Sequence, residues 1–194
     1  MKFLLLSLLS LLSTSVGAAI FNTSHFVEPG KIALGLEPEF TMTNGAGLAM
    51  NLKYTQGLND LVNLQGMIGM GGGPRQFRAG GTLNFDFFPD MEGQPGIGLG
   101  TRLMWYQLPG YGQLEAQLIP YIHKTFYTAA KSEFEPFLAF PIGYGFSQGN
   151  YLPISTLALG SIFGINEHFR YVVEIGIPIN NSECTLSGGI VWYP

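Results

Sequence analysis

Apolar and polar residues alternate one by one along most of this chain. In the stretch AGLAMNLKYT at residues 46–55, leucine, methionine and tyrosine take every second position, and smaller or polar residues stand between them. A period of two is typical of a β-strand whose two faces meet different surroundings. Similar stretches recur from Lys31 onward, and short breaks rich in Gly, Asn or Pro separate them. The pattern predicts ten consecutive strands, at residues 31–42, 46–57, 61–70, 76–88, 96–107, 113–126, 133–146, 153–164, 168–178 and 184–193.

The charged residues of these strands fall almost entirely on one face. In residues 76–88, for example, Phe85 and Phe87 share one face, whereas Arg78 and Asp86 share the other. The polar faces carry few charges, spaced with Gly, Asn, Gln and Tyr. The solvated face of a soluble sandwich would instead be rich in Lys, Glu, Ser and Thr. This distribution favours an enclosed polar interior and an apolar exterior.

An enclosed interior requires paired charges, because an isolated buried charge is costly. We therefore expect a network of charged side chains across a small lumen, formed by Glu37, Glu39, Lys53, Arg78, Asp86, Arg102, Glu115, Glu135, Arg170 and Glu174. The predicted fold class is all-β, a closed antiparallel up-and-down transmembrane β-barrel of about ten strands, with eight as the alternative and short loops at both ends.

Prolines inside the predicted strands oppose this fold, since each removes one hydrogen bond of the sheet. Five positions are affected: Pro38, Pro120, Pro136, Pro141 and Pro178. In a closed barrel surrounded by hydrocarbon, water cannot replace the lost bonds. We therefore expect bulges at these positions, or strands that are shorter than the alternation indicates.

The composition fits a protein without an ordinary wet surface. Only 11% of the 194 residues are charged, whereas about 25% is typical of soluble domains. The net charge of −4 provides no basic surface, so we exclude nucleic acid as a partner. Cys184 is the only cysteine, and an internal disulfide is therefore impossible.

The start of the chain is typical of a cleaved export signal. A leucine-rich run follows one lysine, and small residues lead to a cut after Ala18. The apolar run is shorter than the roughly 20 residues that span a bilayer as a helix. We predict a signal peptide at residues 1–18, an N-terminal segment at residues 19–30 and a barrel domain at residues 31–194.

In these features the chain resembles the small outer-membrane β-barrel proteins of Gram-negative bacteria, a porin-like family of eight- to ten-stranded barrels. The export signal, the strand pattern and a last strand ending in GGIVWYP carry the resemblance. Aromatic residues near the strand ends add candidate interfacial girdles: Tyr54, Phe87, Phe88, Trp105, Tyr106, Trp192 and Tyr193. The family usually ends in an aromatic residue, which resembles a signal read by the barrel insertion machinery. Here Pro194 follows the aromatic pair.

The resemblance implies an outer-membrane location, both termini in the periplasm, and outer-membrane lipids and the insertion machinery as partners. The outer loops would all be short, whereas adhesins and substrate-gripping barrels of this class carry long ones. We therefore expect a structural or narrow-pore role, with a lumen closed by paired charges. We expect no enzymatic activity, no cofactor and no metal.

Two alternatives remain open. His123 would lie beside Glu115 and near Tyr121 in the lumen, an arrangement that suggests the base of a barrel enzyme acting on lipid or peptide. No serine has a recognisable motif spacing, and His25 and His168 are expected to be solvated. The other alternative is a secreted soluble β-barrel that binds an apolar ligand, which requires the Phe- and Leu-rich faces to point inward.

Overall fold

The computed structural model of the chain describes residues 26–43, 45–71, 73, 75–127 and 132–194. The predicted signal peptide at residues 1–18, and residues 19–25 after it, lie outside the described residues. None of the described residues belongs to a helix long and apolar enough to cross a membrane. The strand segments are β1 (Ile32–Thr41), β2 (Gly47–Asn59), β3 (Val62–Gly71), β4 (Phe77–Phe88), β5 (Gly96–Leu108), β6 (Tyr111–His123), β7 (Phe126–Tyr127), β8 (Glu133–Ala139), β9 (Ile142–Ser147), β10 (Asn150–Gly164), β11 (Phe169–Asn180) and β12 (Thr185–Trp192).

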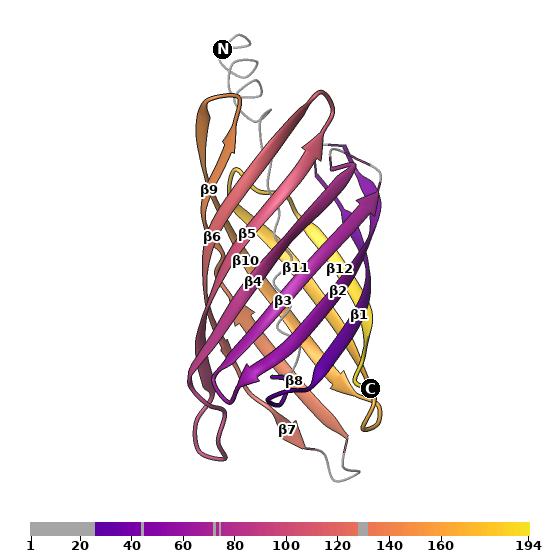
Figure 1. Cartoon of the computed structure of the whole chain (residues 1–194), viewed down its shortest axis with the longest axis vertical. Coiled ribbons are helices and arrows are strands. Elements are labelled where there is room, and N and C mark those ends of the chain that lie inside the picture. The colour runs from indigo at the N-terminus through magenta and orange to yellow at the C-terminus, as the bar shows by residue number, and fades with distance from the viewer. Residues whose placement is uncertain (1–25, 44, 72, 74, 128–131) are drawn as a thin grey trace, which may run out of the picture.

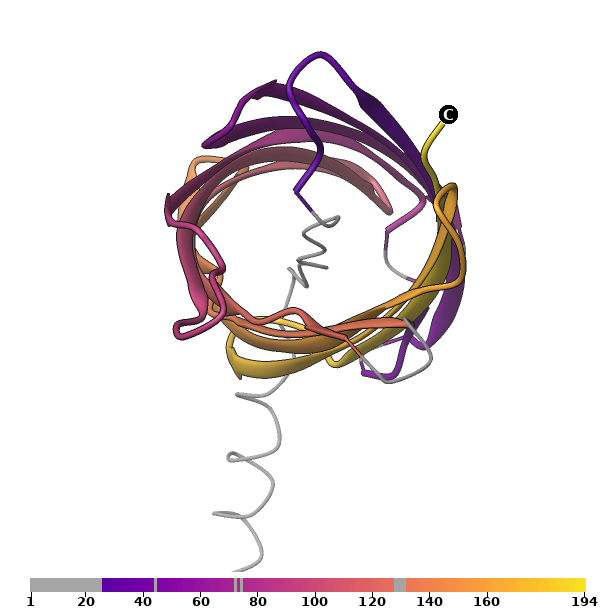
Figure 2. The ribbon, with the colours of Figure 1, turned by 90° about the horizontal axis from the view of Figure 1, so that it is seen from below.

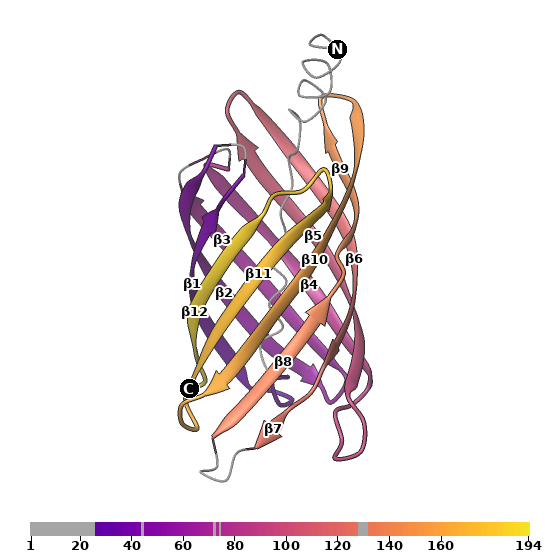
Figure 3. The same cartoon turned by 180° about the vertical axis from the view of Figure 1, so that it is seen from behind.

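The strand segments form one closed antiparallel sheet, which wraps into a barrel (Figures 1 and 3). Strands that follow one another in sequence pair, and β12 returns to pair with β1. β8 and β9 are two halves of one strand, because both lie between β6 and β10. β7 follows β6 and pairs with the start of β8. The barrel therefore has ten strands, and the predicted fold class is confirmed.

The prolines are accommodated without opening the barrel. Pro141 falls in the break between β8 and β9, and the register of β10 and β11 shifts beside Pro178. Proline carbonyls still accept hydrogen bonds in the sheet: the Phe140 N–H donates to the Pro120 oxygen at 2.9 Å, and the Thr156 N–H donates to the Pro141 oxygen at 3.0 Å. The pairing of β1 with β12 also lacks partners at Glu37 and Pro38. The expected interruptions are therefore present, but they remain local.

The apolar face of the sheet lies outside and the polar face lies inside, as the alternation predicts. Leu103 and Val173 are 54% and 46% exposed on the outer surface, whereas Arg78 and Glu174 are 2% and 1% exposed in the interior. The soluble-barrel alternative is therefore wrong, because it requires the Phe- and Leu-rich faces to surround an internal ligand. An apolar exterior of this kind is suited to acyl chains.

The two ends of the barrel carry different parts of the chain. We call the end where β1 begins and β12 ends the base, and the opposite end the top; the C-terminus marks the base in Figure 1. Residues 26–30 precede β1 at the base, where the indigo chain turns inward from the rim toward the barrel axis (Figure 2). The connections at the top are the β1–β2, β3–β4, β5–β6, β9–β10 and β11–β12 turns.

Candidate functional site

The barrel interior is the candidate functional site, because it collects the charged side chains of the strands. Of the ten predicted lumen residues, only Arg170 is partly exposed. The other nine are buried: Glu37, Glu39, Lys53, Arg78, Asp86, Arg102, Glu115, Glu135 and Glu174. Their hydrogen bonds and ion pairs define several groups along the barrel.

Lys53 and Glu37 form the first group, on the neighbouring strands β1 and β2. The Lys53 Nζ lies 2.7 Å from the Glu37 Oε2, and both side chains are almost completely excluded from solvent. Glu37 and Lys53 are diagonal neighbours, since Glu37 is directly opposite Asn51. A buried pair of this kind is costly to break, because the remaining charge would lose this counter-ion in a place that water does not reach.

The second group extends from β4 past β3 to β2 and β1, and it consists of Arg78, Asn51 and Glu39. The Arg78 Nη1 and the Asn51 Nδ2 both donate to the Glu39 Oε2. Gly69 on β3 makes room for this group: a Cβ there would lie 2.3 Å from the Asn51 Oδ1 and 2.9 Å from the Arg78 Cγ. The absence of a side chain at Gly69 thus lets Arg78 reach past β3 to Glu39 on β1.

Arg102, Gln117 and Glu115 form the third group, on β5 and β6. The Arg102 Nη2 donates to the Gln117 Oε1. The Glu115 carboxylate accepts from the Gln113 Nε2 at 2.9 Å and from the Gln117 Nε2 at 3.3 Å. The partner amides replace part of the hydration that burial removes from Glu115.

Two residues that the strand pattern does not single out close the top of the lumen. Arg75 comes from the β3–β4 turn and Glu183 from the β11–β12 turn, and both are buried, with the Arg75 Nη2 lying 3.2 Å from the Glu183 Oε2. The Arg75 guanidinium also stacks over the Tyr106 ring at 4.6 Å. Burial raises the pKa of the Glu183 carboxyl above its ordinary value, and Arg75 only partly offsets this. Burial lowers the pKa of Arg75, but Glu183 and neighbouring groups outweigh it and raise that pKa overall.

His123 lies near the base and not beside Glu115, so the predicted catalytic pairing is wrong. Its Nδ1 is 2.8 Å from a Glu135 oxygen, and its Nε2 is 3.5 Å from an Asp86 oxygen. The expected proximity to Tyr121 is confirmed, with the two ring centroids 6.0 Å apart. Glu115 and His123 stand eight residues apart on the same strand, which separates them by roughly 27 Å at about 3.4 Å per residue.

Arg170 belongs to a separate pair at the rim of the base. Its Nη2 donates to the Glu133 Oε2 at 2.7 Å, and its guanidinium stacks over the Tyr193 ring at 4.6 Å. His168 is exposed in the nearby turn, as expected, and its Nδ1 lies 2.9 Å from the Tyr193 backbone oxygen. His25 lies outside the described residues.

Carboxylates outnumber basic groups in the interior. Among the described residues, the buried ionisable side chains are seven carboxylates, four Lys or Arg side chains and His123. Three of them, Arg75, Glu183 and His123, do not belong to the predicted set. An enclosed excess of negative charge produces a potential that favours cations over anions.

Part of the interior is apolar, which the expected network of charges does not describe. A cluster of buried residues toward the base comes mainly from β6, β8, β10, β11 and β12: Ile119, Tyr121, Phe137, Ala139, Ala158, Ile162, Val172 and Val191. In a narrow barrel, side chains must fill the interior at the density of a protein core. Apolar side chains fill it without requiring hydrogen-bond partners.

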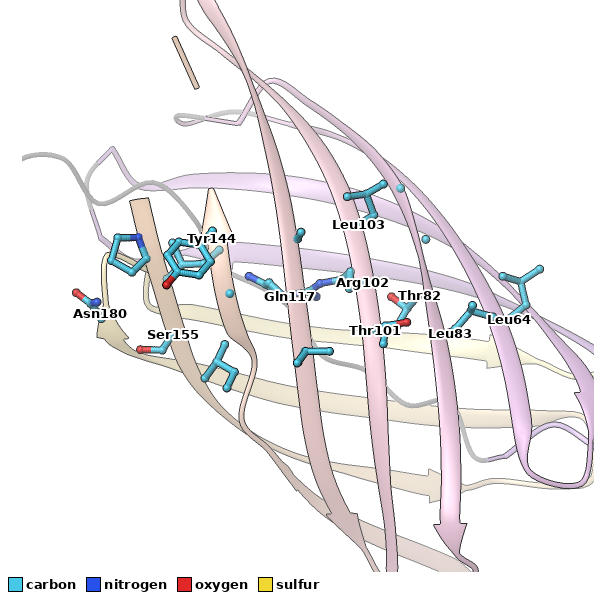
Figure 4. A pocket seen from close by; sticks show the side chains of 18 residues that line it. Leu64, Thr82, Leu83, Thr101, Arg102, Leu103, Gln117, Tyr144, Ser155 and Asn180 are labelled. Carbon is cyan, nitrogen blue, oxygen red and sulfur yellow. The ribbon is translucent and has the colours of Figure 1, made fainter. Parts of the chain in front are cut away.

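A recess of about 960 Å³ lies in the barrel wall toward the side of β4 to β6, β9 and β10. Figure 4 shows Leu64, Leu83 and Leu103 along one part of the recess and Arg102 with Gln117 in another. Gly80, Gly81, Ala116 and Gly143 also line it, and their small size explains the hollow. Its lining is mostly apolar.

The described residues include no group of three or more His, Cys, Asp or Glu side chains that could hold a metal ion. No protein-family model and no curated protein matches the chain. Among solved structures, an outer membrane channel from Pseudomonas putida F1 is similar, with a TM-score of 0.56, 8% identity, and coverage of 91% of this chain and 100% of that chain. At that identity the likeness concerns the fold alone.

Two designed proteins also match over most of their length. A set described as de novo designed transmembrane β-barrels gives a TM-score of 0.43 at 13% identity, with coverage of 88% of this chain and 100% of that chain. The de novo designed protein TMB2.3, solved by solution NMR, gives 0.39 at 14% identity, with coverage of 86% and 95%. The fold and the two faces of the sheet define this chain as a transmembrane-type β-barrel.

Proposed function

We propose that this chain is an integral outer-membrane β-barrel protein of a Gram-negative bacterium, exported through its predicted signal peptide, with a structural or narrow-pore role. One observation carries the proposal: the barrel exposes a continuous apolar surface while it buries its charged residues. Outer-membrane lipids would surround that surface, and the barrel insertion machinery would assemble it.

The filled interior supports a closed or very narrow lumen. Tyr106 is the largest side chain that is completely buried, and it lies in the upper lumen beneath Arg75. A ten-stranded interior is only slightly wider than an eight-stranded one, which side chains can fill. Any residual permeation would favour small cations, because of the excess of buried carboxylates.

Planar-bilayer recordings of the refolded mature chain test this role. We expect the wild-type protein to show little or no conductance. Tyr106→Ala shortens the largest side chain of the upper lumen and should increase the conductance, with a reversal potential that indicates cation selectivity. Tyr171→Ala provides the matched control, since Tyr171 is exposed on the outer surface and its loss should leave the conductance unchanged. A large, steady conductance of the wild-type protein would contradict the closed lumen.

We propose no catalytic role for the lumen histidine. His123 is held between the carboxylates of Asp86 and Glu135, which supports a structural function in closing the base. An enzymatic role predicts that His123→Ala abolishes turnover of outer-membrane lipids or peptides by the purified barrel. Hydrolysis that depends on His123 would therefore contradict this part of the proposal.

A further inference from the structure

We propose that the segment Phe26–Gly30, hereafter the plug, is a displaceable stopper of the barrel base. The plug precedes β1 and turns inward across the opening of the base (Figure 2). Its side chains differ sharply in environment: Val27 is 1% exposed, whereas Glu28 and Pro29 are exposed. Val27 is thus the buried anchor of the plug, whereas Glu28 and Pro29 stay at the rim.

The wall of β2 and β3 holds the backbone of the plug. The Asn63 side chain faces the lumen, and the orientation of its amide is assigned from its neighbours. In the orientation that satisfies both atoms, the amide nitrogen donates to the Val27 oxygen at 3.2 Å, and the amide oxygen accepts from the Val27 N–H at 3.0 Å. The Gly30 N–H donates to the Gly57 oxygen at 2.9 Å. Both bonding groups of Val27 are therefore satisfied by one side chain, as a buried backbone requires.

Gly57 is the position that lets the plug approach the wall. A Cβ at Gly57 would lie 2.2 Å from the Glu28 oxygen and 2.3 Å from the Val27 oxygen. Both atoms belong to backbone, so a small rotation of a side chain could not relieve the overlap. An alanine at this position and the seated plug are mutually exclusive.

The side chain of Val27 belongs to the apolar cluster of the lumen, which also contains Ala33, Phe137 and Val191. The plug is thus held in two ways, with its backbone bound to Asn63 and Gly57 and its anchor included in the apolar cluster. The plug is a short segment on the N-terminal side of β1. Segments of this kind open locally at a low cost in free energy.

The bonds that hold the plug differ from those of the upper lumen. The plug backbone is bound by Asn63 and Gly57, whereas the ionic groups of the upper lumen use Arg75, Arg102 and Glu115. Release of the plug would expose the apolar part of the lumen to the compartment below the base. The inference adds a movable element to the closed lumen of the proposed function, and its test does not depend on conductance.

Thiol accessibility of the anchor tests the plug. The parent protein carries Val27→Cys together with Cys184→Ser, so that the introduced thiol is unique, and it is refolded in lipid vesicles. We expect its reaction with a small water-soluble methanethiosulfonate reagent to be slow relative to the protein unfolded in urea. Adding Asn63→Ala removes two hydrogen bonds and should accelerate the reaction about thirtyfold, which corresponds to about 2 kcal/mol of lost seating free energy. Gly57→Ala should accelerate it at least as much.

Gly66→Ala is the matched control for Gly57→Ala. It makes the same substitution on β3, at a site where a Cβ meets nothing within 4 Å, and it should leave the rate unchanged. Mobility on unheated gels verifies that each variant retains a folded barrel. Equal rates for the Gly57→Ala, Asn63→Ala and Gly66→Ala proteins would overturn the proposal, as would a parent thiol that reacts as fast as in the unfolded chain. Either result is distinguishable from failure of the closed lumen, which the bilayer recordings report.

Discussion

Replacing Lys53 with methionine removes one cation from the interior and leaves its neighbour without that partner. Lys53 and Glu37 are 3% and 1% exposed, and their charged atoms are 2.7 Å apart. Water therefore cannot reach Glu37 well enough to replace the ammonium group. Removal of one partner from a buried ion pair typically costs about 3–5 kcal/mol. We expect Lys53→Met to reduce the free energy of unfolding by this amount, about a hundredfold or more in the folding equilibrium.

Urea unfolding in lipid vesicles, followed by tryptophan fluorescence, measures this loss. Lys31→Met is the matched control, because Lys31 is exposed at the base and its substitution should change the stability by less than about 0.5 kcal/mol. Adding Glu37→Gln to Lys53→Met removes the negative charge of the Glu37 carboxylate and should restore most of the stability. If Lys53→Met and Lys31→Met prove equally stable, the lumen is wetter than its burial indicates, and the reasoning from buried pairs is refuted.

Two further predictions concern other parts of the barrel. Gly69→Ala should destabilise the protein by about 1–3 kcal/mol, the usual cost of overpacking, whereas Gly66→Ala should be nearly neutral. The same urea titration compares the two variants. Equal stabilities would show that Gly69 does not make room for the ionic group. Burial favours a higher pKa for Asp90, but hydrogen bonds from Lys124 and the Thr125 N–H outweigh it and lower the pKa below its usual 3.8. A lowered carboxyl pKa stabilises the fold above pH 3.8, and this contribution disappears as the pH falls through the lowered value. Hydrogen exchange of the β4–β5 turn should therefore accelerate in acid, and Asp90→Asn should remove that dependence.

The strands and their two faces could be predicted because both follow from local sequence. A period of two assigns each residue to a face, and a shift by one residue would reverse every assignment. Arg78 and Leu103 accordingly lie inside and outside as expected. Even the prolines act locally, since Pro141 divides one strand into β8 and β9.

The contacts inside the barrel could not be predicted in the same way. His123 on β6 meets Asp86 on β4 over the intervening strand β5, so their strands are not neighbours in the sheet. Such a contact depends on the stagger of the closed barrel, which alternation does not specify. Arg75 and Glu183 lie in turns, where no period indicates which side chains point inward. The available signal is that each of these turns carries a charged residue, Arg75 in one and Glu183 in the other.

Val27 illustrates a different reason for a missed residue. It precedes the first strand and belongs to no alternating pattern, so the sequence offers no face to which it could be assigned. Its backbone approaches Gly57, a contact between residues 30 positions apart in the sequence. Long-range packing of this kind is set by tertiary structure, and local propensity does not encode it.

The orientation of the sheet is the central claim, and the two tryptophans test it most directly. Trp105 and Trp192 are 39% and 41% exposed on the outer surface, on β5 and β12. Trp105→Phe and Trp192→Phe each leave one tryptophan, whose fluorescence can be recorded in vesicles that contain lipids brominated along the acyl chain. Lipids that surround the barrel should quench both single-tryptophan proteins strongly, whereas aqueous iodide should quench them weakly. Weak quenching by brominated lipid together with strong quenching by iodide would show that the apolar surface does not face the membrane.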